Sequence, residues 1–303
     1  MSFVTKCYYN SYTYNIFDFH NLISMLKIKK KVWVLAIYFA CFIFSINAQN
    51  AKELLQKAKE ALDKNQIQEC IALSKQVIEL KYNISEAYIT MGLAHYAFSE
   101  YDKAIDAYTK AIELDKQYKD AYYNRGVAYY WLSKNTQALS DFKKAIELDK
   151  KDARTYTALG VLYTKLAENE KDKKYTQMAQ DSYLQAISAN SSYPSAYYNL
   201  ALLESEKHPK KALEHLNTYI SLKKDADGFL LRGMIYNDLK KFKEAILDFD
   251  EALKLKNYDP QIYSEKAWAL LKTSNTQEAC KNWKKAQELG STEVSEYLTQ
   301  YCK

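Results

Sequence analysis

The sequence predicts an all-α protein, an α-solenoid of about seven helix-turn-helix units closed by a short C-terminal helix. The first observation is a repeat of 34 residues through everything after about residue 50, in which Gly92 aligns with Gly126 and Ala104 with Ala138. A fixed period of this length is typical of stacked helix pairs, since one pair cannot bury its apolar face alone. The second observation is that only six Gly and three Pro occur among 303 residues, which leaves no room for long flexible linkers.

The unit at residues 119–152 shows how each element is expected to pack. In its first helix Tyr122, Gly126 and Tyr129 fall at i, i+4 and i+7, which is one face of a helix. Phe142 lies on the equivalent face of the second helix. We expect Gly126 to let the two helix backbones approach closely, while Tyr129 and Phe142 fill the volume beside the contact.

The segment Tyr122–Tyr129, followed by Ala145–Asp149, resembles the tetratricopeptide repeat family in the spacing of its aromatic and small residues. The resemblance implies a right-handed α-solenoid of about seven repeats over residues 49–293, with residues 294–303 as a capping helix. It also implies a surface that holds other proteins rather than a catalyst. The family's usual Pro near the end of each repeat is missing here, which weakens the signals that stop the helices.

Two irregularities interrupt the period. Seven extra residues fall within the charged run Glu168–Lys174 of the fourth unit, which we expect to lengthen that helix pair by about two turns. They form either a tolerated surface insertion or a spur that contacts a partner. The fifth unit is one residue short beside Pro209, which we expect to start its second helix.

The N-terminal segment is typical of an export signal. Residues 25–48 combine a basic head, an apolar stretch of 15 residues at 32–46, and the small residue Ala48 before the polar Gln49. This pattern predicts a signal peptide cut after Ala48, and hence a protein exported to the periplasm or cell envelope. The alternative is an uncleaved segment that anchors the chain to a membrane. Residues 1–24 show no clean period, and we expect them to be a non-native or disordered stretch upstream of the true start.

The charge balance argues against a nucleic-acid partner. The chain carries 43 Lys and Arg against 37 Asp and Glu, and most of the excess lies in the first 48 residues, which hold five Lys and one Asp. Nucleic-acid binders are strongly and locally basic. The sequence therefore favours a protein partner.

No motif in the sequence predicts an enzyme, a cofactor or a metal site. A phosphate loop, a nucleophile elbow and a Cys-x-x-Cys pair are all missing from the sequence. Residues 225–228 begin like a calcium loop but lack the later oxygen ligands and the closing Glu. We therefore expect Asp225 to cap a helix instead.

Three cysteines remain after the predicted cut. Cys70 occupies a position where other repeats have Ala, so we expect a packed free thiol there. Cys280 in the last repeat and Cys302 in the capping helix are a possible disulfide. An oxidising location permits that bond, and the spacing alone does not establish it.

The resemblance implies that fixed positions of each first helix form the concave surface of the array. The side chains at those positions are mostly aromatic, apolar or amide-bearing, and we predict that they form a partner-binding groove: Ile89, Leu93, Tyr96, Tyr123, Asn124, Val127, Tyr130, Trp131, Arg154, Thr157, Val161, Tyr198, Asn199 and Leu202. Aromatics with a few amides suit an extended peptide or an amphipathic helix, with the amides bonding its backbone. The alternative is that some of these side chains only pack between neighbouring first helices.

Together these observations predict a non-catalytic scaffold that binds an extended peptide or a helix of another protein in its concave groove. The alternative is a membrane-tethered structural component of an envelope assembly, which requires residues 32–46 to stay uncut.

Overall fold

The computed structural model describes residues 30–170 and 172–302, which form fifteen helices and no strand. The predicted upstream segment 1–24, and residues 25–29 of the predicted signal peptide, lie outside this range. The chain divides into two compact units, one ending at Phe98 and the other beginning at Ser99.

The first unit contains three helices: α2 (Lys30–Asp63), α3 (Ile67–Glu79) and α4 (Ile84–Ala97). Each helix packs on the next, and α2 also contacts α4. Ala58, Cys70 and Ala94 are completely buried in one cluster. Cys70 is a buried free thiol, as its place in the repeat predicts, and burial raises its pKa.

Helix α2 joins the predicted signal segment to the first repeat. It runs for 34 residues and passes the predicted cut after Ala48 without interruption. Within residues 30–170 and 172–302, no helix is both long enough and apolar enough to cross a membrane.

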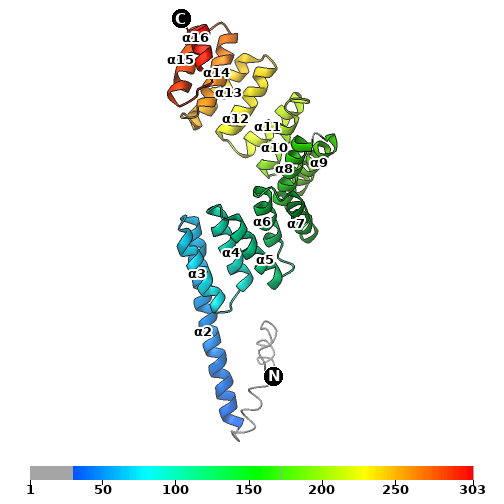
Figure 1. Cartoon of the computed structure of the whole chain (residues 1–303), viewed down its shortest axis with the longest axis vertical. Coiled ribbons are helices and arrows are strands. Elements are labelled where there is room, and N and C mark those ends of the chain that lie inside the picture. The colour runs from blue at the N-terminus through cyan, green and yellow to red at the C-terminus, as the bar shows by residue number, and fades with distance from the viewer. Residues whose placement is uncertain (1–29, 171, 303) are drawn as a thin grey trace. The chain divides into compact units, whose positions relative to one another are not determined.

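The second unit is a series of paired helices (Figure 1). The helices are α5 (Tyr101–Leu114), α6 (Lys119–Trp131), α7 (Asn135–Leu148), α8 (Ala153–Glu170), α9 (Lys173–Ala189), α10 (Pro194–Glu204), α11 (Pro209–Leu222), α12 (Ala226–Asp238), α13 (Phe242–Leu255), α14 (Pro260–Lys272), α15 (Thr276–Glu288) and α16 (Ser295–Tyr301). From α6 onward each odd-numbered helix packs on the even-numbered one before it, and α8, α10, α12 and α14 each also contact the helix before them. The all-α fold of consecutive packed pairs, closed by a short helix that packs on α15, confirms the predicted fold class.

Two helix boundaries confirm sequence predictions. Pro209 is the first residue of α11, where the missing N–H of proline costs nothing. Asp225 is the N-cap of α12, and its Oδ1 accepts a hydrogen bond from the backbone N–H of Gly228 at 3.0 Å. The carboxylate that a calcium loop would need as a ligand is therefore engaged in capping the helix.

The charged insertion lengthens the fourth repeat as predicted. Helices α8 and α9 have 18 and 17 residues, whereas α6 and α7 have 13 and 14. Asp172 caps α9 by accepting a hydrogen bond from the Lys174 backbone N–H at 2.8 Å. The charged insertion therefore makes this helix pair longer than the pair before it, and both helices remain part of the repeat.

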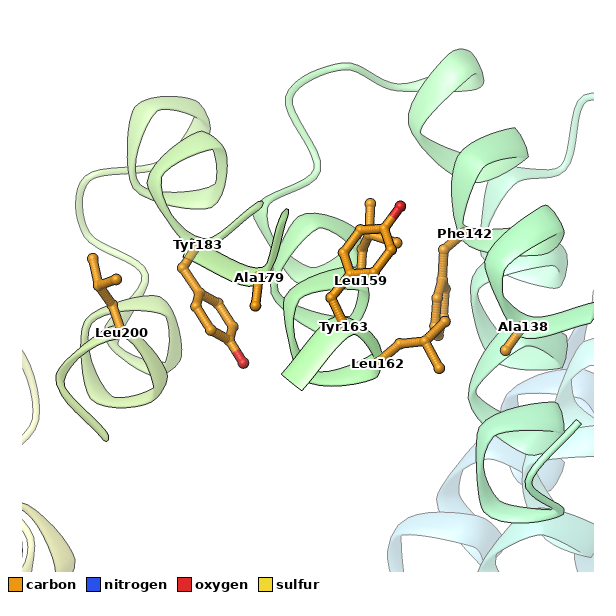
Figure 2. Close-up of a cluster of buried hydrophobic side chains, with 8 residues drawn as sticks. All are labelled: Ala138, Phe142, Leu159, Leu162, Tyr163, Ala179, Tyr183 and Leu200. Carbon is orange, nitrogen blue, oxygen red and sulfur yellow. The ribbon is translucent and has the colours of Figure 1, made fainter. Parts of the chain in front are cut away.

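The repeat core is built from glycines that face aromatic rings. A β-carbon placed on Gly126 would lie 2.7 Å from Cε1 of Phe142, and one placed on Gly160 would lie 2.4 Å from Cε1 of Tyr183. The close neighbour of Gly126 is therefore a ring of the second helix, not its backbone as the sequence suggested. Figure 2 shows Phe142 beside Leu162.

The C-terminal helix is held to the last repeat by packing and by a covalent bond. Cys280 of α15 and Cys302 form a disulfide with an S–S distance of 1.99 Å. Next to it, the ring of Trp268 meets that of Tyr297 edge-on at 4.7 Å, and Trp283 stacks on Tyr301 at 5.8 Å. Together the disulfide and the rings close the apolar end of the array.

Candidate functional site

A shallow hollow of about 220 Å³ opens between the first helices of the third and fourth repeats. It is lined by Tyr123, Val127, Tyr130 and Trp131 of α6, Phe142 of α7, Arg154, Thr157, Ala158 and Val161 of α8, and Tyr193 in the turn before α10. We call this set the α6–α8 hollow. Seven of the predicted groove residues lie in it, which places them together within the second unit.

Spacing along α6 and α8 explains why these side chains converge. On α8, Arg154, Ala158 and Val161 lie at i, i+4 and i+7, and Tyr123, Val127 and Tyr130 do the same on α6. The two helices contact each other as first helices of successive repeats. Their facing stripes therefore form the walls of one hollow.

The rings of the hollow are held by their neighbours. The Arg154 guanidinium lies 4.7 Å from the centroid of the Tyr123 ring, and the Lys165 ammonium lies 4.5 Å from that of Tyr130. The Tyr130 ring meets Trp131 edge-on at 5.9 Å, and Trp131 stacks on Tyr101 at 6.2 Å with planes 5° apart. Such contacts restrict the rings before any partner arrives.

Trp131 is the most exposed large side chain of the hollow, with 56% of its surface accessible. An apolar ring of this size is normally covered in a soluble protein. Exposed aromatic rings that are held rigidly are typical of sites that anchor a partner. Trp131 therefore places an exposed and rigidly held ring at the end of α6.

Arg154 is anchored by two carboxylates. Its Nη2 donates to Asp120 Oδ1 at 2.6 Å and to Asp152 Oδ2 at 3.0 Å, and its Nε donates to Asp152 Oδ1 at 3.2 Å. The hydrogen bond to Asp152 raises the pKa of Arg154. Burial opposes ionisation of Asp152, but the guanidinium outweighs it and holds the pKa of that carboxyl below its ordinary value. The triad fixes a permanent cation at one end of the hollow.

Tyr130 contributes a neutral phenol to the hollow. Burial raises its pKa, and the negative charge of Glu168 raises it further. The Tyr130 hydroxyl therefore stays protonated at neutral pH and can both donate and accept a hydrogen bond.

Several predicted groove residues lie elsewhere. Asn124 is half-buried on α6 but does not line the hollow. On α10, Tyr198 packs on Tyr219 at 5.2 Å, the Asn199 amide donates to the Ser195 carbonyl at 2.7 Å, and Leu202 is 51% exposed. The structure does not bring these α10 side chains into the α6–α8 hollow.

Two predicted groove residues are core residues. Ile89 of α4 is 6% exposed, which agrees with the alternative that some of these side chains only pack between helices. Thr157 is also 6% exposed, and its hydroxyl donates to the Ala153 carbonyl of its own helix. Ile89, Leu93 and Tyr96 all lie on α4 in the first unit.

The sequence reading missed Phe142, Ala158 and Tyr193 as lining residues. Phe142 is a core residue whose ring also reaches the floor of the hollow. Tyr193 lies in the turn before α10, outside the first-helix positions that the family pattern marks. The one available signal for Tyr193 was its place directly before Pro194, because a residue before proline is restricted to extended backbone conformations.

The packed helix pairs and the open hollow define a helical-repeat protein, and comparisons identify its family. Models of the tetratricopeptide repeat match residues 120–152 and 226–259, and a further repeat model of that family matches residues 92–133. The chain therefore contains tetratricopeptide repeats over these residues. Its fold supports a role as a protein-interaction scaffold.

Two solved structures illustrate the shared fold. A tetratricopeptide repeat protein from Parabacteroides merdae is 18% identical with a TM-score of 0.58, over 84% of this chain and 100% of that one. YrrB, described as a tetratricopeptide repeat protein with an unusual peptide-binding site, is 22% identical with a TM-score of 0.52, over 65% of this chain and 99% of that one. At these identities the likeness shows the fold alone.

One curated relative is an enzyme, but the similarity is local. The UDP-N-acetylglucosamine–peptide N-acetylglucosaminyltransferase of Giardia intestinalis is 37% identical over 65 residues, which are 21% of this chain. The match spans only 4% of the length of that transferase and lies in the repeat region.

Proposed function

We propose that this protein is a non-catalytic scaffold that binds a segment of another protein in the α6–α8 hollow. The observation that carries the proposal is the preorganised aromatic wall, in which Trp131 is 56% exposed yet stacked on Tyr101. Rigid aromatic side chains contribute large contact areas at a low cost in conformational entropy.

The chemistry of the lining supports binding rather than bond making. Arg154 is the only charged residue among the lining side chains, and its charge is already paired with Asp120 and Asp152. The lining includes no His, Cys, Asp or Glu, and the Thr157 hydroxyl is committed to a backbone carbonyl. A nucleophile with an adjacent base, which covalent catalysis requires, is therefore missing from the hollow.

One protein of the same fold supports a peptide as the partner. YrrB is described as having an unusual peptide-binding site, and this chain shares its fold. From this shared fold we propose that the partner of this chain is a peptide segment and that it binds in the hollow.

A photo-crosslinking experiment tests the site. A benzophenone amino acid placed at Trp131 is expected to capture a protein partner in the native cells, because that side chain projects from the hollow. The same probe at Tyr258, which is 67% exposed in the turn before α14, is the matched control. Equal capture from the two positions would sink the proposal.

A double substitution provides the complementary loss-of-function test. Tyr130→Ala with Trp131→Ala is expected to abolish capture by a probe at Val161 and to leave the helical circular dichroism intact. Truncating buried aromatic anchors at a hot spot typically costs about 2 kcal/mol or more. If the double variant keeps both its fold and its capture of the partner, the partner does not bind in the hollow, and residues 168–174 are the next surface to test.

We also propose that the protein is exported and that the mature chain begins at Gln49. The support is the basic head, apolar stretch and small residue at 25–48. The alternative is a membrane tether that keeps residues 32–46, which belong to α2. Mass spectrometry of the native N-terminus decides between them, since a tethered form retains the lysines at 29–31.

A further inference from the structure

The hydrogen-bond donors at the α6–α8 hollow exceed its acceptors. The Arg154 Nη1 group has no acceptor among the described residues, because the carboxylates of Asp120 and Asp152 bond Nε and Nη2. Beside the hollow, but not among the side chains that line it, the Lys165 ammonium donates to the Tyr130 carbonyl at 3.3 Å and to Ser133 Oγ at 3.1 Å. An ammonium has three donors, so one remains for a ligand.

Acceptors are scarce in the same place. The side chains that line the hollow include no carboxylate, amide or imidazole, and Thr157, whose hydroxyl donates to the Ala153 carbonyl, is only 6% exposed. The predicted amides do not supply acceptors, since Asn124 and Asn199 do not line the hollow. The hollow therefore presents few exposed acceptors to a backbone N–H of a ligand.

The charges around the hollow nearly cancel. Arg154 is compensated by Asp120 and Asp152, and Glu168 lies close enough to Tyr130 to raise its pKa while Lys165 lies over the same ring. A strongly charged segment would therefore gain little here. The complementary occupant is neutral, rich in acceptors and poor in donors.

From this pattern, and resting on the proposed function, we infer that the hollow binds a proline-rich segment of a partner protein in the polyproline II conformation. A proline carries a carbonyl acceptor and no backbone N–H, which matches the Arg154 Nη1 donor in the lining and the Lys165 donor beside it. Its ring packs on aromatic faces such as those of Tyr130 and Trp131, the kind of wall that polyproline II segments use in other recognition modules. Such a segment has no internal hydrogen bonds to break on binding.

The dimensions of the hollow agree. Arg154 and Val161 are separated by seven residues of α8, or about 10 Å along its axis. One turn of a polyproline II helix has three residues and advances about 9 Å. The hollow therefore accommodates one turn, with the Arg154 guanidinium at one end.

Other peptide conformations fit less well. An extended strand presents backbone N–H groups that would find few acceptors, and leaving such groups buried is unfavourable. An amphipathic helix, about 10 Å or more across, bonds its own carbonyls internally and would cover Arg154 Nη1 and Lys165 without pairing them. These two conformations are the alternatives that the test separates.

Three fluorescein-labelled peptides of nine residues distinguish the conformations by anisotropy titration against the purified full chain. The first is (Pro-Pro-Leu)₃, the second is (Ala-Ala-Leu)₃ with the same leucine spacing, and the third is an amphipathic helical peptide of Leu and Gln. We expect the proline peptide to bind at least about tenfold more tightly than either of the others. We also expect its affinity to depend weakly on salt, because neutral carbonyls make the polar contacts.

Variants assign the binding to the hollow. Tyr130→Ala and Trp131→Ala are expected to weaken the proline peptide by about tenfold or more each, whereas Tyr130→Phe, which keeps the ring, is expected to weaken it by less than about threefold. Lys165→Met is expected to weaken it without disturbing the Arg154 triad. Tyr258→Ala, an exposed aromatic outside the hollow, is the matched control. Circular dichroism checks that each variant is folded.

The outcomes separate this inference from the proposed function. If the crosslinker at Trp131 captures a partner but the alanine or helical peptide binds as tightly as the proline peptide, the scaffold stands and the polyproline inference is overturned. A proline peptide whose affinity is the same in wild type and Trp131→Ala also overturns it. If the proline peptide shows the expected preference but the crosslinker captures nothing, the binding chemistry stands and the cellular role fails.

Discussion

Gly126 and Phe142 fit against each other so closely that a β-carbon on Gly126 would lie 2.7 Å from Cε1 of the ring. The same relation recurs in the sixth repeat, where a β-carbon on Gly233 would lie 2.6 Å from Cε1 of Phe249. Real β-carbons do not approach other atoms so closely. Each of these glycines therefore makes room for an aromatic ring that is 1% exposed or less.

Gly126→Leu is expected to lower the free energy of unfolding by about 1–3 kcal/mol. The clash with Phe142 must exceed the gain in helix propensity, which is about 1 kcal/mol on replacing Gly. A double-mutant cycle with Phe142→Ala measures the interaction free energy between positions 126 and 142. Phe142→Ala alone is expected to cost about 3–5 kcal/mol, and the double variant is expected to lose less than the two single losses together. Additive losses in urea denaturation would show that the two sites do not meet.

A buried ion pair in the third repeat predicts a pH-dependent effect. Arg125 donates from Nε and Nη2 to the two oxygens of Asp141, both at 2.8 Å, and the Asp141 side chain is 7% exposed. Burial raises the pKa of Asp141, and Arg125 opposes that rise. Arg125→Met is expected to cost about 3–5 kcal/mol at neutral pH, because it leaves an unpaired carboxylate in the core.

The sign of the pH dependence follows from the raised pKa. Without Arg125 the pKa of Asp141 rises further, so the folded variant holds a proton more tightly than the unfolded chain. The stability deficit of Arg125→Met is therefore small at low pH and grows as the pH rises through the raised value. Urea denaturation at about pH 5 and about pH 7.5 checks this. Arg125→Met with Asp141→Leu removes the orphaned charge and should recover most of the loss at neutral pH; a deficit independent of pH contradicts the account.

The turns inside the repeats show what the sequence pattern could not reveal. The 34-residue period was enough to place the helix pairs, and Pro209 and Asp225 marked helix starts. The sequence at the helix C-termini lacked the Pro and Gly residues that usually mark them. The structure ends five first helices with a residue in the left-handed region, at Asn65, Ser99, Ser133, Lys240 and Ser274. Because Ser and Lys rarely adopt this conformation, their identity gave no signal.

The candidate site was predictable in part for a similar reason. Position within the repeat placed Tyr123, Tyr130 and Trp131 on the facing surface, because one helix period fixes that face. It did not reveal that Asp120 and Asp152 hold Arg154. Pairing depends on which helices become neighbours, and so it needs the fold.

Relieving one left-handed turn is expected to stabilise the protein. Ser274 has a φ of 63° and lies exposed in the turn after α14, with no hydrogen bond to its hydroxyl among the described residues. Ser274→Gly removes the steric cost of that conformation and is expected to raise the free energy of unfolding by about 0.5–1 kcal/mol. Lys284→Gly, at an exposed position within α15, is the matched control and is expected to lower it by about 1 kcal/mol. If thermal or urea denaturation shows that both substitutions change the free energy of unfolding in the same direction, that result would argue against this turn geometry.

Breaking the Cys280–Cys302 disulfide is expected to loosen the C-terminal end of the array before the rest. The bond closes a loop of sequence separation 22 and holds α16 beside Trp283, which is completely buried. Its loss is expected to reduce the free energy of unfolding by about 3 kcal/mol, since the unfolded chain regains loop freedom. In an array whose repeats contact only their neighbours, hydrogen exchange should quicken in α15 and α16 and stay unchanged in α6 and α7.

Reductant and substitution provide independent routes to the same state. Dithiothreitol should destabilise the wild-type chain by the same amount as Cys280→Ser with Cys302→Ser, and it should leave that double variant unaffected although the buried thiol of Cys70 remains. Hydrogen exchange read by mass spectrometry locates the effect along the chain. If dithiothreitol leaves wild-type unfolding and α16 exchange unchanged, the disulfide does not hold the capping helix in solution.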